Sequence, residues 1–140
     1  MPAKHSIDTE IQLLVTTWEG DAIDTDFSDV LIAYQKEIQE NPEYADYNEI
    51  ADFREITSIK ITPKGLMNIG KIAAKTDLIK GDCRLALIVN QGLAFNLARI
   101  YATYRSLNKS SKKEVRIFNN MDCATKWATE TPSSPISPST

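Results

Sequence analysis

Hydrophobic and polar positions along this chain follow two different spacings, and segments with the two spacings alternate. Strand-like segments are short and rich in β-branched and other apolar residues; they are 11–20, 49–54, 83–90 and 114–119. Helix-like segments carry apolar residues three or four positions apart; they are 24–41, 61–75, 92–107 and 121–130. A further strand at 5–9 is expected to pair with 11–20, which makes about five strands and about four helices.

The order of these segments predicts the fold class. Strands that alternate with helices after an initial hairpin imply an α/β fold with a mixed, mostly parallel sheet and right-handed crossovers. The segment 83–90 is almost wholly apolar, as in parallel strands that are buried on both faces. The segment 49–54 is expected to be a short strand, and the helix at 121–130 is expected to dock through Trp127.

The helix expected at 24–41 has capping candidates at Asp24 and Asp26 and ends before Pro42. Its apolar residues recur at helical spacing and should face the sheet; they are Phe27, Val30, Leu31, Tyr34 and Ile38.

The start of the helix expected at 61–75 is unusual. Thr62 is a good N-cap, and Pro63 suits the first helical position because its missing N–H costs nothing there. Gly65 then stands in the first turn, where an ordinary residue would favour the helix more. Local helix preferences therefore give no reason for this glycine.

The helix expected at 92–107 is apolar around most of its circumference, because several aromatic and alanine side chains widen its main apolar stripe. Two interpretations stay open. The helix is well buried, or it covers an apolar ligand pocket or dips into a membrane interface. On the second interpretation the candidate ligand-binding residues are Phe95, Tyr101 and Tyr104.

Composition limits the kinds of chemistry that are open to the chain. At 140 residues it is expected to form one domain at 1–130, followed by a flexible Ser/Pro-rich tail at 131–140. Cys83 and Cys123 are far apart and are expected to be buried or half-buried thiols in a reduced cytoplasm. His5 is the single histidine, which excludes a multi-histidine metal site within one chain. We expect no metal and no cofactor.

The longest apolar run, at 85–89, is far shorter than the ~20 residues that span a bilayer. A cytoplasmic location, with peripheral membrane association as an option, is the expectation.

Charge is distributed unevenly. Residues 1–60 have a net charge of −10 and residues 61–140 a net charge of +7, within a total of −3. The basic residues Lys109, Lys112 and Lys113 fit either a solvated surface or contact with anionic lipid headgroups. A sequence pI of about 5.2 and the absence of interleaved aromatic residues argue against nucleic acid as a partner.

Catalytic motifs are missing from the sequence. Neither GxGxxG nor GxxxxGK[ST] occurs, so nucleotide phosphate binding is disfavoured. Asp52 and Glu55 beside Arg54 are read as a loop ion pair, since no second base is near them in the sequence. Cys123 is read as a structural cysteine beside Asp122 as the N-cap. The chain is therefore not expected to be an enzyme.

Four sequence blocks carry a resemblance to a known family: "WEG" at the end of the second strand, "YNEIADFREI", "CRLALIVNQGLAFNLARIYATY" and "KEVRIFNNMDCATKWA". Together they resemble the SpoIIAA-like family, within the group of STAS and Sec14-like (CRAL/TRIO) folds, over about residues 3–130. The resemblance implies a mixed sheet with helices wound as a βα superhelix.

The resemblance also gives the segment 62–65 a candidate role. STAS anti-sigma-factor antagonists begin the corresponding helix with Asp-Ser-Ser-Gly-Leu, and a serine there is phosphorylated to switch partner binding. This chain keeps Gly65 and Leu66 but has Thr62, Pro63 and Lys64 in place of the Asp and the two serines. The phospho-switch is therefore in doubt, Thr62 is expected to act as a cap, and Gly65 is expected to let a partner or a neighbouring backbone approach.

Two function classes follow. The first is a non-enzymatic binding module for a small apolar or lipid-like ligand, or one that sits at a membrane surface. The second is a STAS-type module that binds a regulatory protein, or a second copy of itself, through the loop Thr62, Pro63, Lys64 and Gly65.

Overall fold

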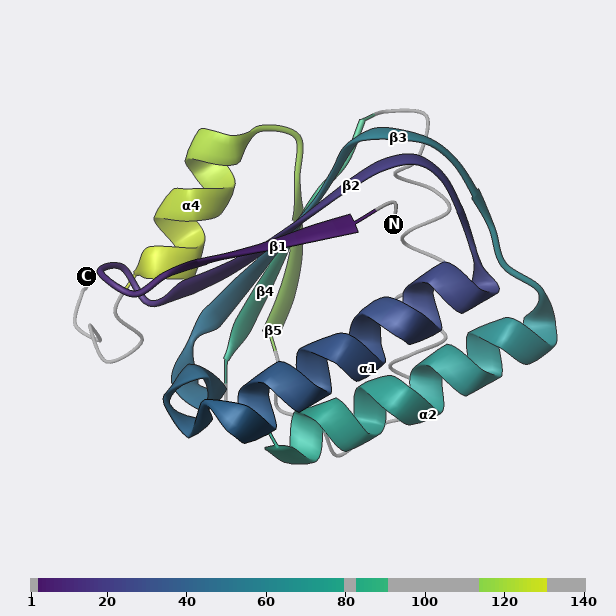
Figure 1. Cartoon of the computed structure of the whole chain (residues 1–140). Helices are drawn as coiled ribbons and strands as arrows, with labels where there is room; N and C mark the ends of the chain where they lie inside the picture. Colours follow the sequence, from purple (N-terminus) through teal and green to yellow (C-terminus); the bar gives the residue numbers. More distant parts are fainter. Residues whose placement is uncertain (1–2, 80–82, 91–113, 131–140) are drawn as a thin grey trace.

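A computed structural model describes residues 3–79, 83–90 and 114–130 of the chain (Figure 1). The elements follow the order β1 Ala3–Asp8, β2 Leu13–Ile23, α1 Asp24–Glu40, the short 3-10 helix η1 Pro42–Asp46, β3 Asn48–Lys60, α2 Pro63–Ile79, β4 Arg84–Ile88, β5 Glu114–Phe118 and α4 Met121–Thr129. The expected helix at 92–107 and the expected tail at 131–140 lie outside the described residues.

One five-stranded sheet organises the fold, with the strands in the order β1-β2-β3-β4-β5. β1 pairs antiparallel with β2, and every later pair is parallel. The prediction of an α/β fold with a mixed, mostly parallel sheet is therefore confirmed, and so is the initial hairpin.

Helices cover the sheet on both faces. Figure 1 shows α1 and α2 side by side against one face and α4 against the other. Because side chains alternate along a strand, neighbouring residues point to opposite faces of the sheet and contact different helices. Ile50 and Ile88 pack with Trp127 of α4, whereas Phe53 and Leu87 pack with α1. The docking of α4 through Trp127 is confirmed.

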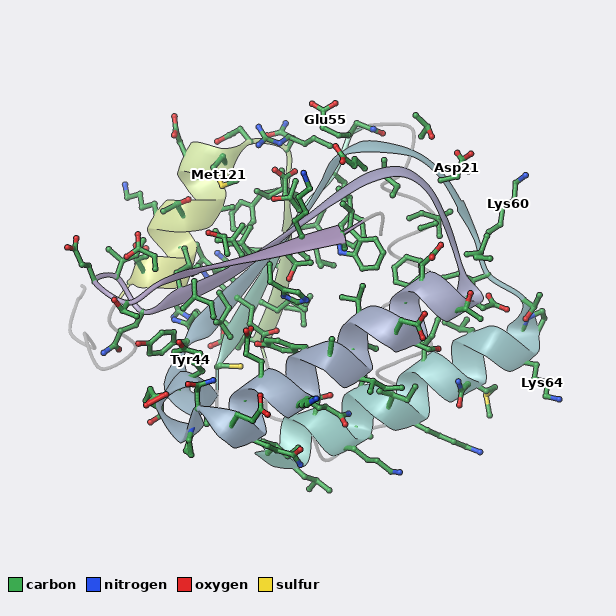
Figure 2. The ribbon with its side chains drawn as sticks, viewed as in Figure 1. Asp21, Tyr44, Glu55, Lys60, Lys64 and Met121 are labelled. Atoms are coloured by element: carbon green, nitrogen blue, oxygen red, sulfur yellow. The ribbon has the colours of Figure 1, made fainter. Side chains whose placement is uncertain are left out.

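β3 is longer than the short strand expected at 49–54, because it continues to Lys60 alongside β2. Within β3, only the segment 49–52 pairs with β4. Beyond it, β2 and β3 pair with each other alone and form a two-stranded arm. Figure 1 shows this arm curving over towards the starts of α1 and α2, and Figure 2 places Asp21 and Lys60 on it. The arm brings the first residues of the two helices together.

Two local expectations are wrong. Cys123 is exposed rather than buried or half-buried, while Cys83 is buried as expected. The N-cap of α4 is Asn120, whose side-chain oxygen accepts the Cys123 backbone N–H at 2.8 Å, and not Asp122. The cap stands one residue before the helix because its side chain has to reach back to the free N–H groups of the first turn. Among the described residues, no helix is long and apolar enough to cross a membrane.

Candidate functional site

A cavity of about 200 Å³ lies between the α1–α2 pair and the sheet. Most of its wall is apolar, and three stacked aromatic rings contribute to it: Trp18 lies 4.5 Å from Phe27 and 5.6 Å from Phe53 between ring centroids. Every strand and both helices of this layer supply lining residues, namely His5, Thr16, Trp18, Phe27, Val30, Leu31, Tyr34, Glu49, Ala51, Phe53, Ile69, Ala73, Thr76, Leu85, Leu87 and Val115. The lining is therefore assembled from residues that are distant in the sequence.

One wall of the cavity is polar, and we call Tyr34, Glu49 and His5 the polar wall. Tyr34 on α1 and Glu49 on β3 are both buried. The His5 ring of β1 stacks on Tyr34, with ring centroids 5.7 Å apart, although His5 itself is exposed. Its Nδ1 is 3.1 Å from the Thr16 hydroxyl oxygen. Partial loss of water around the ring lowers the pKa of His5, although the negative charges of Glu37 and Glu49 act in the opposite direction.

The Tyr34 hydroxyl is the unusual atom of this wall. It is buried, and among the described residues no group meets the distance and angle limits of a hydrogen bond to it. Burial raises the pKa of Tyr34 well above its ordinary value, and so do the charge of the Glu49 carboxylate and the approach of that carboxylate to the hydroxyl; the phenol is therefore neutral. A buried hydroxyl without a partner costs ~1–3 kcal/mol relative to one that is satisfied.

Other polar side chains of the cavity have partners. The Thr76 hydroxyl, which is almost fully buried, donates to the Ile72 carbonyl at 3.1 Å and accepts from the Gln35 amide at 2.8 Å. The Cys83 thiol donates to the Glu49 carboxylate at 3.4 Å. Tyr34 therefore differs from its polar neighbours, because its hydroxyl lies near the Glu49 carboxylate without completing a hydrogen bond of good geometry.

The loop at 62–65 is joined to the start of α1 by Asp24. The Asp24 carboxylate accepts the Thr62 backbone N–H at 2.9 Å and the Thr62 hydroxyl at 2.6 Å. The same hydroxyl oxygen accepts the Gly65 N–H at 2.9 Å, so Thr62 is the N-cap of α2. A β-carbon on Gly65 would overlap the Asp24 carboxylate. A side chain of this chain, rather than a partner or a neighbouring backbone, occupies the space that the glycine leaves.

The rest of this loop is exposed. Lys64 projects away from the start of α2 (Figure 2), and Met67 lies beside it in a shallow depression that Lys71 also borders. Of the two capping candidates of α1, Asp26 accepts the Ile23 N–H at 2.9 Å, whereas Asp24 binds Thr62. The arm makes the difference, because it places Asp24 next to α2.

Asp52 and Arg54 form the expected ion pair, although within β3 and not in a loop. The guanidinium donates to both carboxylate oxygens, at 2.9 and 2.7 Å. Burial alone would raise the pKa of Asp52, but the hydrogen bonds and charge of Arg54 outweigh it and hold the pKa below 3.8. Residues two apart in a strand share a face, so the pair forms without a turn.

Replacement of Arg54 by methionine should lower the free energy of unfolding at pH 7 by about 1 kcal/mol, because the buried Asp52 carboxylate loses the guanidinium and keeps only the backbone N–H of residue 54. A lowered folded-state pKa means that Asp52 contributes stability above pH 4 and loses it as the pH falls through the folded pKa. The difference between wild type and Arg54→Met in urea denaturation should therefore shrink from pH 7 to pH 3. A difference that stays constant over this range would contradict the assignment.

Among the described residues, no group of three or more His, Cys, Asp or Glu side chains could hold a metal ion. Neither a protein-family profile nor a curated protein matches the sequence. The structure is similar to the crystal structure of an uncharacterized protein from the DUF3478 family with a SpoIIAA-like fold from Shewanella loihica PV-4. The TM-score is 0.61 at 13% identity, and the match covers 90% of this chain and 91% of that chain.

The chain has a SpoIIAA-like fold. The expectation drawn from the four sequence blocks is thereby confirmed at the level of the fold.

Within the SpoIIAA-like fold, the residues expected to form the site are only partly described. Phe95, Tyr101 and Tyr104 lie outside the described residues, and so do Lys109, Lys112 and Lys113. Thr62, Pro63, Lys64 and Gly65 lie together at the start of α2, as the resemblance implies. Sequence reasoning assigned Tyr34 only to the packed face of α1 and gave Glu49 no role. An acidic residue at the start of an apolar strand was the one signal that could have singled out Glu49.

Proposed function

We propose that this protein is a non-enzymatic module that binds a small apolar ligand in the cavity between α1, α2 and the sheet. The observation that carries the proposal is an apolar cavity into whose wall the Tyr34 hydroxyl is buried without a partner. Proteins normally satisfy buried polar groups, and a bound molecule is one way of doing so. Ligand sites are commonly apolar with a few polar groups that fix orientation.

The size of the cavity limits the ligand. A dry cavity of about 150 Å³ is enough to bind benzene, whereas sites for drug-sized ligands occupy about 300–1,000 Å³. The cavity of about 200 Å³ therefore suits a single ring, a compact bicyclic compound or a short chain. A complete phospholipid would not fit within it, which favours the small-ligand form of the proposal over the lipid form.

The cavity can be filled from α2. Ala73 lines it, so Ala73→Phe should place a ring where the ligand would lie. We expect the wild-type protein to bind added toluene in NMR titration and to show a co-purified small molecule by native mass spectrometry. Ala73→Phe should lose both signals while unfolding at the same or a higher temperature, because filled cavities stabilise.

A matched control is available on α1. Ala33→Phe makes the same change at an exposed position that does not line the cavity, so it should retain toluene binding. Wild-type protein that neither binds toluene nor carries a co-purified molecule would overturn the proposal. Equal binding by Ala73→Phe would place the site elsewhere.

A second candidate function is protein binding at the start of α2, which the SpoIIAA-like fold favours. The supporting observation is the exposed Met67 between the basic residues Lys64 and Lys71. Met67→Asp should then abolish binding of a purified partner, with the fold retained by circular dichroism. Binding at an anionic membrane and formation of a homodimer stay predictions, and salt-sensitive flotation with anionic liposomes would test the first.

A further inference from the structure

The side of the α1–α2 layer that is turned away from the sheet, which we call the outer face, is a surface that the cavity does not use. We infer that this face pairs with the same face of a second copy of the chain, so that α1 of each copy lies on α2 of the other. The inference rests on the second candidate function, protein binding around Met67, and names the partner.

On α2 the outer face is basic and apolar. Lys64, Met67, Lys71, Lys75 and Leu78 follow one another at intervals of three or four residues, so they share one side of the helix. All five are exposed, Met67 to 44% and Leu78 to 87%. No acidic residue interrupts this stripe, which therefore suits an anionic surface with apolar spots.

On α1 the outer face has such a surface. Asp29, Ile32, Lys36 and Glu40 are exposed and follow the same spacing, and Ile32 is exposed to 53%. The whole of α1 carries five acidic residues against one lysine, whereas α2 carries three lysines against one aspartate. Within the described part of the chain, the ion pairs involve neither helix. The opposite charges of the two helices are therefore left for an intermolecular contact.

The arrangement of the helices allows both contacts to form at once. α1 and α2 lie side by side and run in the same direction, with their starts joined through Asp24 and Thr62 (Figure 1). A two-fold axis parallel to the helices would turn α1 of each copy onto α2 of the other, as a self-complementary dimer requires. Acidic α1 would then meet basic α2 twice, with Ile32, Met67 and Leu78 between them.

The size of the outer face sets the expected strength. Each helix has 17 residues and is about 25 Å long, and two packed helices are about 20 Å wide. The face thus covers roughly 500 Å² per copy, or about 1,000 Å² for the pair, the lower end for a specific interface. We expect a dimer with micromolar affinity that weakens in high salt, because exposed charges are screened.

Charge reversal on one helix at a time tests the inference by sedimentation velocity. Lys71→Glu with Lys75→Glu makes both helices acidic, and Asp29→Lys with Glu40→Lys makes both basic. Each double variant alone should dimerise at least about tenfold more weakly than wild type, since every reversed contact occurs twice. An equal mixture of the two should recover affinity to within about threefold of wild type, because acidic helices again meet basic ones.

A single substitution gives the opposite effect. Lys36 is the one base of α1, and it would face the lysines of α2 in the second copy. Lys36→Glu should therefore tighten the dimer by about threefold. The matched control is Lys4→Glu with Lys126→Glu, which makes the same change in charge as the α2 double variant at exposed positions of β1 and α4. It should dimerise as wild type does.

The outcomes separate the inference from the proposed function. Wild-type protein that is monomeric up to about 200 µM, beyond the micromolar affinity expected for this area, would overturn the inference. So would a dimer that the reversals leave unchanged, or one that mixing does not restore. A monomer that instead binds phosphatidylglycerol vesicles through the same lysines would assign the face to a membrane. Toluene binding, measured on the same samples, should be the same in all of them, so the cavity is tested separately.

Discussion

Replacement of Trp127 by alanine should lower the free energy of unfolding by about 3–5 kcal/mol. Trp127 is 6% exposed and fills the contact between α4 and the strands that carry Ile50 and Ile88. The guanidinium groups of Arg84 and Arg116 each lie 5.0 Å from its ring. Truncation would remove the largest side chain of this layer and leave both arginines without the ring. Because small domains are stable by only about 5–15 kcal/mol, the loss is severe.

Chemical denaturation followed by circular dichroism measures this effect. Lys126→Ala is the matched control, because Lys126 precedes Trp127 in α4 and is exposed. It should change the free energy of unfolding by less than about 0.5 kcal/mol, as surface substitutions usually do. A loss below 1 kcal/mol for Trp127→Ala would mean that α4 contributes little to the core.

Replacement of Gly65 by alanine should have opposite effects in two backgrounds. In the wild-type protein we expect a loss of about 2 kcal/mol, because the new β-carbon would displace the Asp24 carboxylate from its two hydrogen bonds to Thr62. In the Asp24→Ala background the obstruction is gone. Alanine should then stabilise α2 by up to about 1 kcal/mol, the usual helix preference of alanine over glycine.

A double-mutant cycle on Asp24 and Gly65, measured by urea denaturation, yields the coupling between the two positions. Asp24→Ala alone should destabilise, since it removes both acceptors from Thr62. Gly65→Ala that destabilises equally in both backgrounds would contradict the contact. The control is Ala74, another position on α2 away from Asp24, where Ala74→Gly should cost the same in either background.

The same contact bears on the missing phospho-switch. The Thr62 hydroxyl donates one hydrogen bond, to the Asp24 carboxylate, and accepts another, from the Gly65 N–H. A phosphate on this oxygen would remove the donated proton and bring negative charge against a carboxylate. The geometry thus agrees with the sequence-based expectation that Thr62 is a cap, and it provides the reason for Gly65 that local helix preferences lacked.

The spacing of hydrophobic residues was by itself sufficient to predict the helices and strands whose apolar faces pack into the core. The spacing of Val30, Tyr34 and Ile38 predicted α1, and the apolar run from Leu85 to Val89 predicted β4, because burial on one or both faces leaves a repeating pattern. The length of β3 was missed because beyond Asp52 its pairing is with β2 alone, and no local pattern records which strands extend past their neighbours. The N-cap of α4 was predicted at Asp122, two residues after the actual cap, Asn120. Several polar side chains precede this helix, and the sequence pattern does not show which of them caps it.

The sequence by itself determined the α/β class, the initial hairpin and the docking of Trp127, because hydrophobic spacing is a property of each segment alone. Only the tertiary structure decided that Asp24 fills the space beside Gly65, and that Tyr34 and Glu49 meet in one wall of an apolar cavity. Each of these contacts joins residues from different elements. Their distances depend on how strands and helices cross, which the pattern within one segment does not encode.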